Sequence, residues 1–176
     1  MKTIPLGHGK AAIVDDEDFE YLSQYRWFLQ STKELYVQRH NNEKKRGKIY
    51  MHREILRCLP GVMIDHINGN SLDNRKCNLR AATNSQNMAN QPKQKRNLCR
   101  FKGICVDKKN GGWRAQISIN GETKNLGHFL DDESAARAYN DAARKQFGEY
   151  ARLNEFPDVA RINKGTSSQK AKAEAV

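Results

Sequence analysis

Residues 62–91, VMIDHINGNSLDNRKCNLRAATNSQNMANQ, constrain the fold of this chain more than any other stretch. The apolar run VMIDHI predicts a strand, and NLRAA predicts a second strand after the turn formers NGNSLDNRKC. Thr83 is followed three positions later by Gln86, which is a capping box and predicts a helix over 84–90. The expected order of elements is therefore strand, long turn, strand, helix.

Polar side chains are spaced along this pattern so that they can converge. Asp65 and His66 lie at the end of the first expected strand. Asn87 lies one turn into the expected helix, from which its side chain could reach back towards that strand end. A neutral imidazole with a pKa near ~6.5 can take a proton from water at physiological pH. A carboxylate and an amide oxygen are hard ligands that favour Mg²⁺ or Mn²⁺ over zinc.

The segment IDHINGNSLDNRKCNLRAATNSQN resembles the HNH nuclease family, whose ββα-metal (His-Me finger) fold has this order of elements. The resemblance extends over about residues 48–90. It implies that His66 is the general base of phosphodiester hydrolysis and that Asp65 and Asn87 hold one divalent cation, Mg²⁺ or Mn²⁺. It also implies that Asn78 braces the hairpin and orients the histidine. Many family members carry a third histidine at the position of Asn87, so this chain resembles the branch that ends in asparagine.

Basic side chains flank these residues and are expected to hold the backbone of a nucleic acid, although a solvated surface explains each of them nearly as well. They are Arg53, Arg75, Lys76 and Arg80. His52, in the segment YMHR, also resembles a position common in this branch. We expect it to pack or to contact a phosphate rather than to catalyse.

The first sixty residues predict short elements in an irregular mixture. KTIPLGHGKAAIV predicts a hairpin around its Gly-His-Gly turn, and Asp15 or Asp16 can begin a helix over EDFEYLSQYRW. ELYVQRH and GKIYMHR predict two further strands, and HREILRCL predicts a helix that ends at Pro60. Residues 1–90 are therefore expected to form the nuclease domain, with its ββα core at about 62–90.

Positive charge is concentrated in one short polar stretch. The net charge of the chain is +11, and the segment QPKQKRNLCRFK at 91–102 contains basic residues and no acidic one. This composition predicts a basic linker over 91–101. Its residues Lys93, Lys95 and Arg96 are expected to contact DNA.

Residues 102–156 predict a second domain of a different kind. FKGICVDKK, GWRAQISIN and ETKNLGHF predict three antiparallel strands, separated by NGG and by the tight-turn signal NG. In the middle strand Trp113, Ala115, Ile117 and Ile119 alternate with polar residues. Asp131 or Asp132 can begin a helix that ends at Gly148 and presents a face of Ala135, Ala138, Tyr139 and Ala142 to the sheet. One antiparallel sheet packed on one helix follows, so the predicted fold class of the chain is α+β.

These residues resemble the APETALA (ethylene-response-factor) type of DNA-binding domain, nearly from end to end, including LGHF and AARAYNDAA. In that family the open face of the sheet enters the major groove. The resemblance implies that Lys108 and Lys124 lie near phosphates and that the following residues face DNA: Lys102, Arg114, Gln116, Ser118, Thr123 and Asn125. The chain has fewer arginines than the plant pattern and no tryptophan on the exposed face.

Together these patterns predict a metal-dependent DNA endonuclease of the site-specific homing type, acting on double-stranded DNA. A homodimer is possible, since cutting both strands normally needs two active sites. A catalytically inactive DNA-binding regulator is the alternative; an RNA-binding protein lacks support because the chain has no aromatic stacking platform. No small-molecule cofactor is expected.

The remaining expectations concern the surroundings of the protein. No apolar run approaches the ~18 residues of a membrane span, and the four cysteines include no C-x-x-C pair of the kind that binds zinc. The resemblance implies a mobile phage or prophage gene, and hence the host cytoplasm. The polar tail 157–176 is expected to be disordered.

Overall fold

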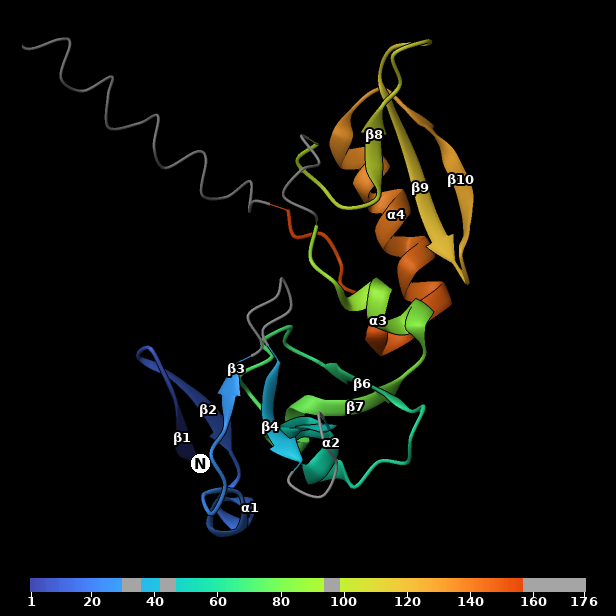
Figure 1. Cartoon of the computed structure of the whole chain (residues 1–176). Coiled ribbons are helices and arrows are strands. Elements are labelled where there is room, and N and C mark those ends of the chain that lie inside the picture. The colour runs from blue at the N-terminus through green and yellow to red at the C-terminus, as the bar shows by residue number, and fades with distance from the viewer. Residues whose placement is uncertain (30–35, 42–46, 94–98, 157–176) are drawn as a thin grey trace, which may run out of the picture. The chain divides into compact units, whose positions relative to one another are not determined.

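The computed structural model describes residues 1–29, 36–41, 47–93 and 99–156, which form an α+β chain (Figure 1). It divides into two compact units. The first comprises Met1–Pro92 together with Ser118–Lys124 and Ala143–Arg152, and the second comprises Lys93–Ile117, Asn125–Ala142 and Leu153–Val176. The domain limits drawn from the sequence remain predictions. The expected disordered tail 157–176 and the basic residues Lys95 and Arg96 lie outside the described residues.

The N-terminal hairpin is confirmed. Strands β1 (Lys2–Gly7) and β2 (Lys10–Val14) pair antiparallel. The turn places His8 and Gly9 at positive φ, 52° and 70°. Helix α1 (Asp16–Leu22) follows, with Asp15 as its N-cap residue. The Asp15 carboxylate does not cap this helix but accepts a hydrogen bond from the backbone N–H of Lys76, at 2.8 Å.

A three-stranded sheet follows, in the order β3-β4-β5. Strands β4 (Val37–Asn41) and β5 (Gly47–Tyr50) confirm the two expected strands, while the two-residue β3 (Phe28–Leu29) was not predicted. Helix α2 (Met51–Leu56) ends earlier than expected, because Arg57 adopts the left-handed conformation with φ 48°. The Arg53 guanidinium then donates to the carbonyl oxygens of Leu59 and Val62 and holds the following turn.

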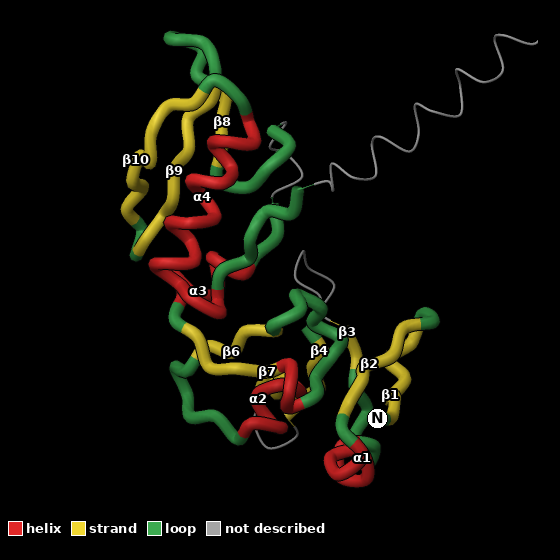
Figure 2. Tube along the Cα trace, turned by 180° about the vertical axis from the view of Figure 1, so that it is seen from behind, coloured by secondary structure: helices red, strands yellow, loops and turns green. Residues whose placement is uncertain are grey.

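The expected strand-turn-strand-helix unit is present. Strand β6 (Met63–His66) pairs antiparallel with β7 (Leu79–Ala82), after the short 3-10 helix η1 (Lys76–Asn78). Figure 2 shows the two strands side by side, with helix α3 (Asn84–Asn90) following β7. The capping box is confirmed: Thr83 Oγ1 accepts from Gln86 N at 3.2 Å, and Gln86 Oε1 accepts from Thr83 N at 2.8 Å.

The hairpin β6–β7 shares one core with the N-terminal elements. Buried apolar side chains from β1, β2, α1, β4, α2, β6, β7 and the loop after α1 pack together: Ile4, Leu6, Ala12, Val14, Leu22, Trp27, Val37, Met51, Ile55, Ile64 and Leu79. The long turn is also attached to β2, because Ile13 N donates to Leu72 O and Asn74 N donates to Ile13 O, both at 2.8 Å. The described elements β1, β2, α1, β4 and α2 therefore support the hairpin β6–β7.

The C-terminal sheet and helix are confirmed. Strands β8 (Ile104–Val106), β9 (Trp113–Ile119) and β10 (Glu122–Phe129) form a sheet in the order β10-β9-β8, packed against helix α4 (Asp132–Phe147). Asn120 and Gly121 both have positive φ, 51° and 88°, as a type I′ hairpin turn requires. A second 3-10 helix, η2 (Gly148–Tyr150), follows α4.

The helix face that packs on this sheet differs slightly from the prediction. Ala135 and Tyr139 are buried, as expected, whereas Ala138 and Ala142 are only half-buried. Ala136 is fully buried in their place, so the helix is rotated by about one residue from the expected orientation. Small side chains still line the contact, which keeps the helix close to the sheet. No helix among the described residues is both long and apolar enough to cross a membrane.

Candidate active site

Asp65 and His66 are adjacent in β6 but have different neighbours. Side chains of successive strand residues point to opposite faces. Asp65 lies opposite Arg80 in the register and contacts β7 and α3, whereas His66 lies opposite Leu79 and contacts the long turn. Both side chains are buried. The end of β6 thus presents a carboxylate on one side and an imidazole on the other.

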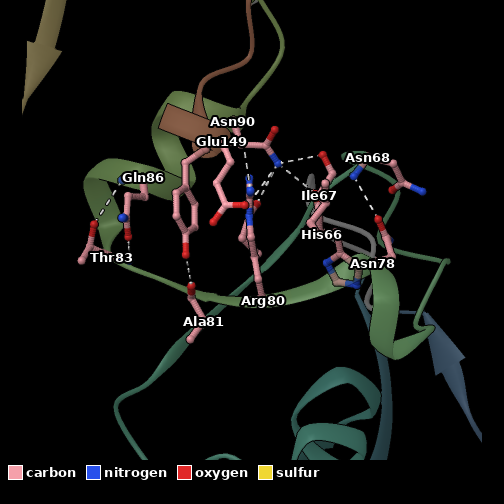
Figure 3. Close-up of polar contacts among 12 residues, drawn as sticks. His66, Ile67, Asn68, Asn78, Arg80, Ala81, Thr83, Gln86, Asn90 and Glu149 are labelled. Atoms are coloured by element: carbon pink, nitrogen blue, oxygen red, sulfur yellow. Dashed lines mark hydrogen bonds and ion pairs between the residues drawn. The ribbon is translucent and has the colours of Figure 1, made fainter. Parts of the chain in front are cut away.

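The Asp65 carboxylate is held by two side chains, those of Arg80 and Asn90, which are labelled in Figure 3. Arg80 Nε donates to Asp65 Oδ2 at 3.0 Å, and Arg80 Nη2 lies 2.9 Å from the same oxygen. Asn90 Nδ2 lies 3.0 Å from both oxygens of Asp65. The side chains of Arg80 and Asp65 are only 12% and 5% exposed, so water screens this ion pair weakly.

The α3 side chain that meets Asp65 is that of Asn90, one helical turn beyond Asn87. Its amide nitrogen also lies 2.9 Å from the carbonyl oxygen of His66 and 3.2 Å from that of Ile67. Four oxygens therefore surround one amide nitrogen, which has only two hydrogens to share among them. Asn87 is half-buried on the same helix, and its assignment as a cation ligand stays a prediction.

His66 is oriented by a side chain of the long turn. Asn74 Nδ2 donates to Ser71 O at 3.2 Å, which leaves Asn74 Oδ1 facing His66 Nε2 at 3.4 Å. An amide oxygen can only accept, so Nε2 carries the proton and Nδ1 carries the lone pair. Burial lowers the pKa of His66, against the opposing influence of Asn74 and of the carboxylates of Asp65 and Asp73. The ring is therefore neutral at neutral pH.

His52 packs beside His66 in a group of rings. Its ring stacks on that of Tyr50 with centroids 5.7 Å apart and meets the His66 ring edge-on at 5.4 Å. Tyr36 contacts both histidine rings, at 5.3 Å and 6.1 Å. Burial, with a smaller contribution from His66, lowers the pKa of His52 to about 3. His52 is thus a neutral ring that packs, and its Nδ1 has no hydrogen-bond partner among the described residues.

Asn78 joins the two ends of the long turn. Its Oδ1 accepts from Asn68 N at 3.0 Å, and its Nδ2 donates to Asp73 O at 2.7 Å. Asn78 O also accepts from Ile67 N at 2.9 Å. These bonds are of the kind that a bracing residue makes. The role implied for Asn78 stays a prediction.

Several polar residues of the site were not singled out from the sequence. Asp73 and Asn74 are buried in the long turn, where Asp73 pairs with Arg75 at 2.7 Å and Asn68 Nδ2 donates to Asp73 at 2.9 Å. In the sequence these residues read as turn formers. The one signal in the sequence was the high number of Asn and Asp residues in this turn, which exceeds what a solvent-exposed turn requires.

The basic residues expected to contact DNA near the site already have intramolecular partners. Arg53 binds two backbone carbonyls, and Arg80 binds Asp65. Arg75 pairs with Asp73, and Lys76 Nζ lies 2.6 Å from Glu17. Arg75 and Lys76 stay partly exposed, so each retains donors that can turn to a phosphate. Their assignment as DNA contacts stays a prediction.

The residues expected on the DNA-facing sheet differ in exposure. Gln116 and Lys102 are half-buried, as is Lys93 of the expected linker, which donates to Cys99 O at 2.7 Å. Ser118 and Thr123 share a hydrogen bond at 3.0 Å, and the remaining residues are exposed: Lys108, Arg114, Ser118, Thr123, Lys124 and Asn125. Their expected contacts with DNA also remain predictions.

The donor atoms around Asp65 suit a hard divalent cation. Within the part of the chain that the structure describes, no three His, Cys, Asp or Glu side chains form a metal-binding group. The expected cation ligands, the Asp65 carboxylate and the Asn87 amide, are not such a group, because they include only one acidic side chain. Asp65 and the two carbonyls beside it supply only oxygen, as Mg²⁺ and Mn²⁺ prefer, and in this structure these oxygens surround the amide nitrogen of Asn90. Oδ1 of Asp65 accepts one hydrogen bond from the described residues, so it retains a lone pair for a cation.

Comparison with known proteins points to one family. A family profile described as HNH endonuclease matches residues 35–89. An uncharacterized HNH endonuclease of Acanthamoeba polyphaga mimivirus is 31% identical over 159 residues, which cover 86% of this chain and 79% of that protein. Protein 3.8 of Escherichia phage T7 is 33% identical over 93 residues, covering 53% of this chain and 76% of that protein. No solved structure matches the chain.

Proposed function

This chain belongs to the HNH endonuclease family, which makes it a phosphodiester hydrolase that acts on DNA, and from that premise we propose a metal-dependent, site-specific endonuclease of the homing type. One observation carries the proposal. The His66 ring is buried, neutral and fixed by Asn74 at the end of the strand that also carries Asp65. A base and a hard oxygen ligand are thereby adjacent in the chain.

In this proposal His66 activates the attacking water. The Nε2–H is directed to Asn74 Oδ1, so Nδ1 accepts the proton of water. The carboxylates of Asp65 and Asp73 favour the imidazolium that forms after the transfer. Asn78 holds the turn closed and thereby keeps Asn74 in place. The chain thus supplies the base, its orientation and the charges that stabilise its protonated form.

Asp65 and Asn87 are the residues that would hold one Mg²⁺ or Mn²⁺ in this proposal. Such a cation supplies Lewis-acid stabilisation of the charge on the phosphate and on the leaving 3′ oxygen. Asn90 serves as a positioning residue for the carboxylate, because its amide joins both oxygens of Asp65 to the helix that carries Asn87. Arg80 holds the same carboxylate from β7 through an ion pair.

Target choice is assigned to the APETALA-type reader at 102–156. Support comes from the antiparallel sheet packed on one helix and from the exposed polar side chains Arg114, Thr123, Lys124 and Asn125. A reader tethered to a nuclease raises the local concentration of the nuclease at chosen sites. Two such chains acting on one site would account for cutting of both strands.

The test is cleavage of supercoiled plasmid. We expect nicked or linear product with Mg²⁺ or Mn²⁺ and none with EDTA. His66→Ala should abolish cutting while leaving DNA affinity unchanged, whereas His40→Ala, which removes an exposed histidine of β4, should cut normally. Full cutting by His66→Ala would refute the assigned base. An inactive wild-type chain that still binds DNA would instead favour the inactive regulator.

A further inference from the structure

We propose that Arg80 and Tyr150 are positioning residues for Asp65, so that the nuclease site is completed by the short segment after α4. The inference rests on the proposed role of Asp65 as a cation ligand. Glu149 and Tyr150 lie in η2, and both belong to the first unit together with β6, β7 and α3. The contact joins residues 69 positions apart in the sequence.

The Arg80 guanidinium is fixed on three sides. Its Nε and Nη2 face Asp65 Oδ2, at 3.0 and 2.9 Å. Its Nη1 donates to the carbonyl oxygen of Glu149 at 3.0 Å, and its central carbon lies 4.0 Å from the centre of the Tyr150 ring. Figure 3 shows Arg80 directed towards Glu149 and Asn90. The two edges and one face of the guanidinium are thus occupied.

The segment that supplies these contacts is itself attached to the nuclease hairpin. Tyr150 OH donates to Ala81 O of β7 at 3.0 Å. Arg152 N donates to Ala89 O of α3 at 3.1 Å. Tyr150 therefore lies over Arg80 while its hydroxyl holds the same strand that carries Arg80. This arrangement fixes the ring relative to the ion pair.

The physical need for such a support follows from burial. A buried carboxylate requires a counter-charge of defined geometry, because an unpaired charge is strongly disfavoured in a poorly solvated place. Arg80 Nη2 makes no hydrogen bond of good geometry to any described residue despite its distance from Asp65, so Nε makes the one directed bond to that carboxylate. A long side chain held by one directed bond keeps many rotamers. Tyr150 and the Glu149 carbonyl remove that freedom and thereby fix the direction of the carboxylate.

A direct contact between Arg80 and DNA would be the competing explanation. The Arg80 side chain is only 12% exposed, and its Nη1 and Nε already donate within the chain. A phosphate contact would break these bonds. The observations favour a role exerted through Asp65.

The experiment uses the full chain with Tyr150→Leu, which removes the ring, and Tyr150→Phe, which keeps the ring and loses the hydroxyl. We expect Tyr150→Leu to lower kcat by about ten- to a hundredfold with little change in KM for DNA. Binding of Mn²⁺ to the DNA-free protein can be measured by electron paramagnetic resonance. Its dissociation constant should rise about tenfold, because the loss of a cation–π contact such as that of Arg80 with Tyr150 changes an equilibrium constant by about that factor. Tyr150→Phe keeps the ring over Arg80 but loses the bond to Ala81, so kcat and Mn²⁺ affinity should fall less than in Tyr150→Leu.

Phe156→Leu is the matched control. Phe156 lies in the second unit, and the guanidinium of Arg137 lies 4.3 Å from the centre of its ring, so this variant loses the same kind of contact in a unit that does not contain Asp65. It should leave Mn²⁺ binding unchanged. If Tyr150→Leu does not fold, Arg80→Lys is tested in its place. Lysine keeps the positive charge but lacks the planar guanidinium that contacts Asp65, Glu149 and Tyr150. This variant should show the same loss of kcat and of Mn²⁺ affinity.

Two results would overturn the inference. Unchanged kcat and Mn²⁺ affinity in Tyr150→Leu, with only a lower unfolding temperature, would make Tyr150 purely structural. A raised KM for DNA with unchanged kcat would make it a DNA contact. The variant Asp65→Asn distinguishes failure of the positioning role from failure of the proposed function. If Asp65→Asn cuts DNA normally, Asp65 holds no essential cation and the proposed function fails. If Asp65→Asn is inactive while Tyr150→Leu is fully active, only the positioning role is refuted.

Discussion

Gly103→Ala should destabilise the second unit far more than the same change at Gly111. Both glycines have positive φ, 77° and 71°, so an alanine at either position must adopt the left-handed conformation. A Cβ at Gly111 would meet nothing within 4 Å. A Cβ at Gly103 would lie 2.6 Å from Cγ of the Tyr139 ring and still closer to Cδ2 and Cε2. The pair of variants therefore separates the backbone cost from the packing cost.

The magnitude follows from these two costs. The left-handed conformation costs a residue other than glycine about 1–2 kcal/mol, and both variants incur it. Overpacking adds about 1–3 kcal/mol at Gly103 alone. Tyr139 is buried, at 5% exposure, so its ring has little room to withdraw. We expect Gly103→Ala to lose about 2–5 kcal/mol of unfolding free energy in total, and Gly111→Ala about 1–2 kcal/mol.

Hydrogen exchange of the β9 amides measures the difference directly. Gln116 N donates to Gly103 O at 2.8 Å, so the protected amides lie beside the substitution. In the regime where exchange reports the opening free energy, about 1.4 kcal/mol corresponds to a tenfold change in rate. The Gly103→Ala amides should therefore exchange faster than those of Gly111→Ala by about one to two decades. Equal rates in the two variants would refute the close packing of Tyr139 on Gly103.

Three further predictions concern the first unit. Asn74→Ala removes the oxygen that orients His66, so nicking assays should show kcat reduced about ten- to a hundredfold with an unchanged KM for DNA. Asn90→Ala leaves oxygens around Asp65 without their donor and should cost about 1–3 kcal/mol in urea unfolding; an unchanged midpoint would contradict this. Burial lowers the pKa of His52 to about 3, so only the unfolded chain takes up this proton as the pH falls below the ordinary histidine value. Acid titration should therefore show about 1.4 kcal/mol of stability lost per pH unit from this group between about pH 6.5 and 3, and His52→Phe should reduce that slope.

Local patterns in the sequence were sufficient for most elements. The capping box at Thr83 predicts the start of α3 because its two hydrogen bonds span three residues. The Asn120-Gly121 pair predicts the β9–β10 turn because both residues accept positive φ. The predicted end of α2 was wrong, because the helix ends at Leu56 rather than at Pro60. Beyond that end, Arg53 binds the carbonyls of Leu59 and Val62 in the turn that follows.

The sequence was enough to select Asp65, His66, Asn78 and Asn87 as a candidate site, and that assignment stays a prediction. The partners of these side chains could not be predicted. The Asp65-His66 pair, its spacing to Asn78 and the helix after the second strand all follow from the sequence. Whether Asn87 or Asn90 meets Asp65 depends on the rotation and tilt of α3 against the hairpin. That orientation is set by packing, and both asparagines satisfy the local pattern equally well.

Sequence alone determined the order of strands, turns and helices apart from the two-residue β3, the residue types of an HNH nuclease, and the concentration of basic charge at 91–102. These depend on interactions among residues a few positions apart, or on composition, and both can be read along the chain. Tertiary structure alone decided that Ile64 and Leu79 share a core with Ile4 and Val14, and that Asp65 is held by Arg80 under Tyr150. Those contacts join segments distant in sequence, and their existence depends on how complete elements pack against one another.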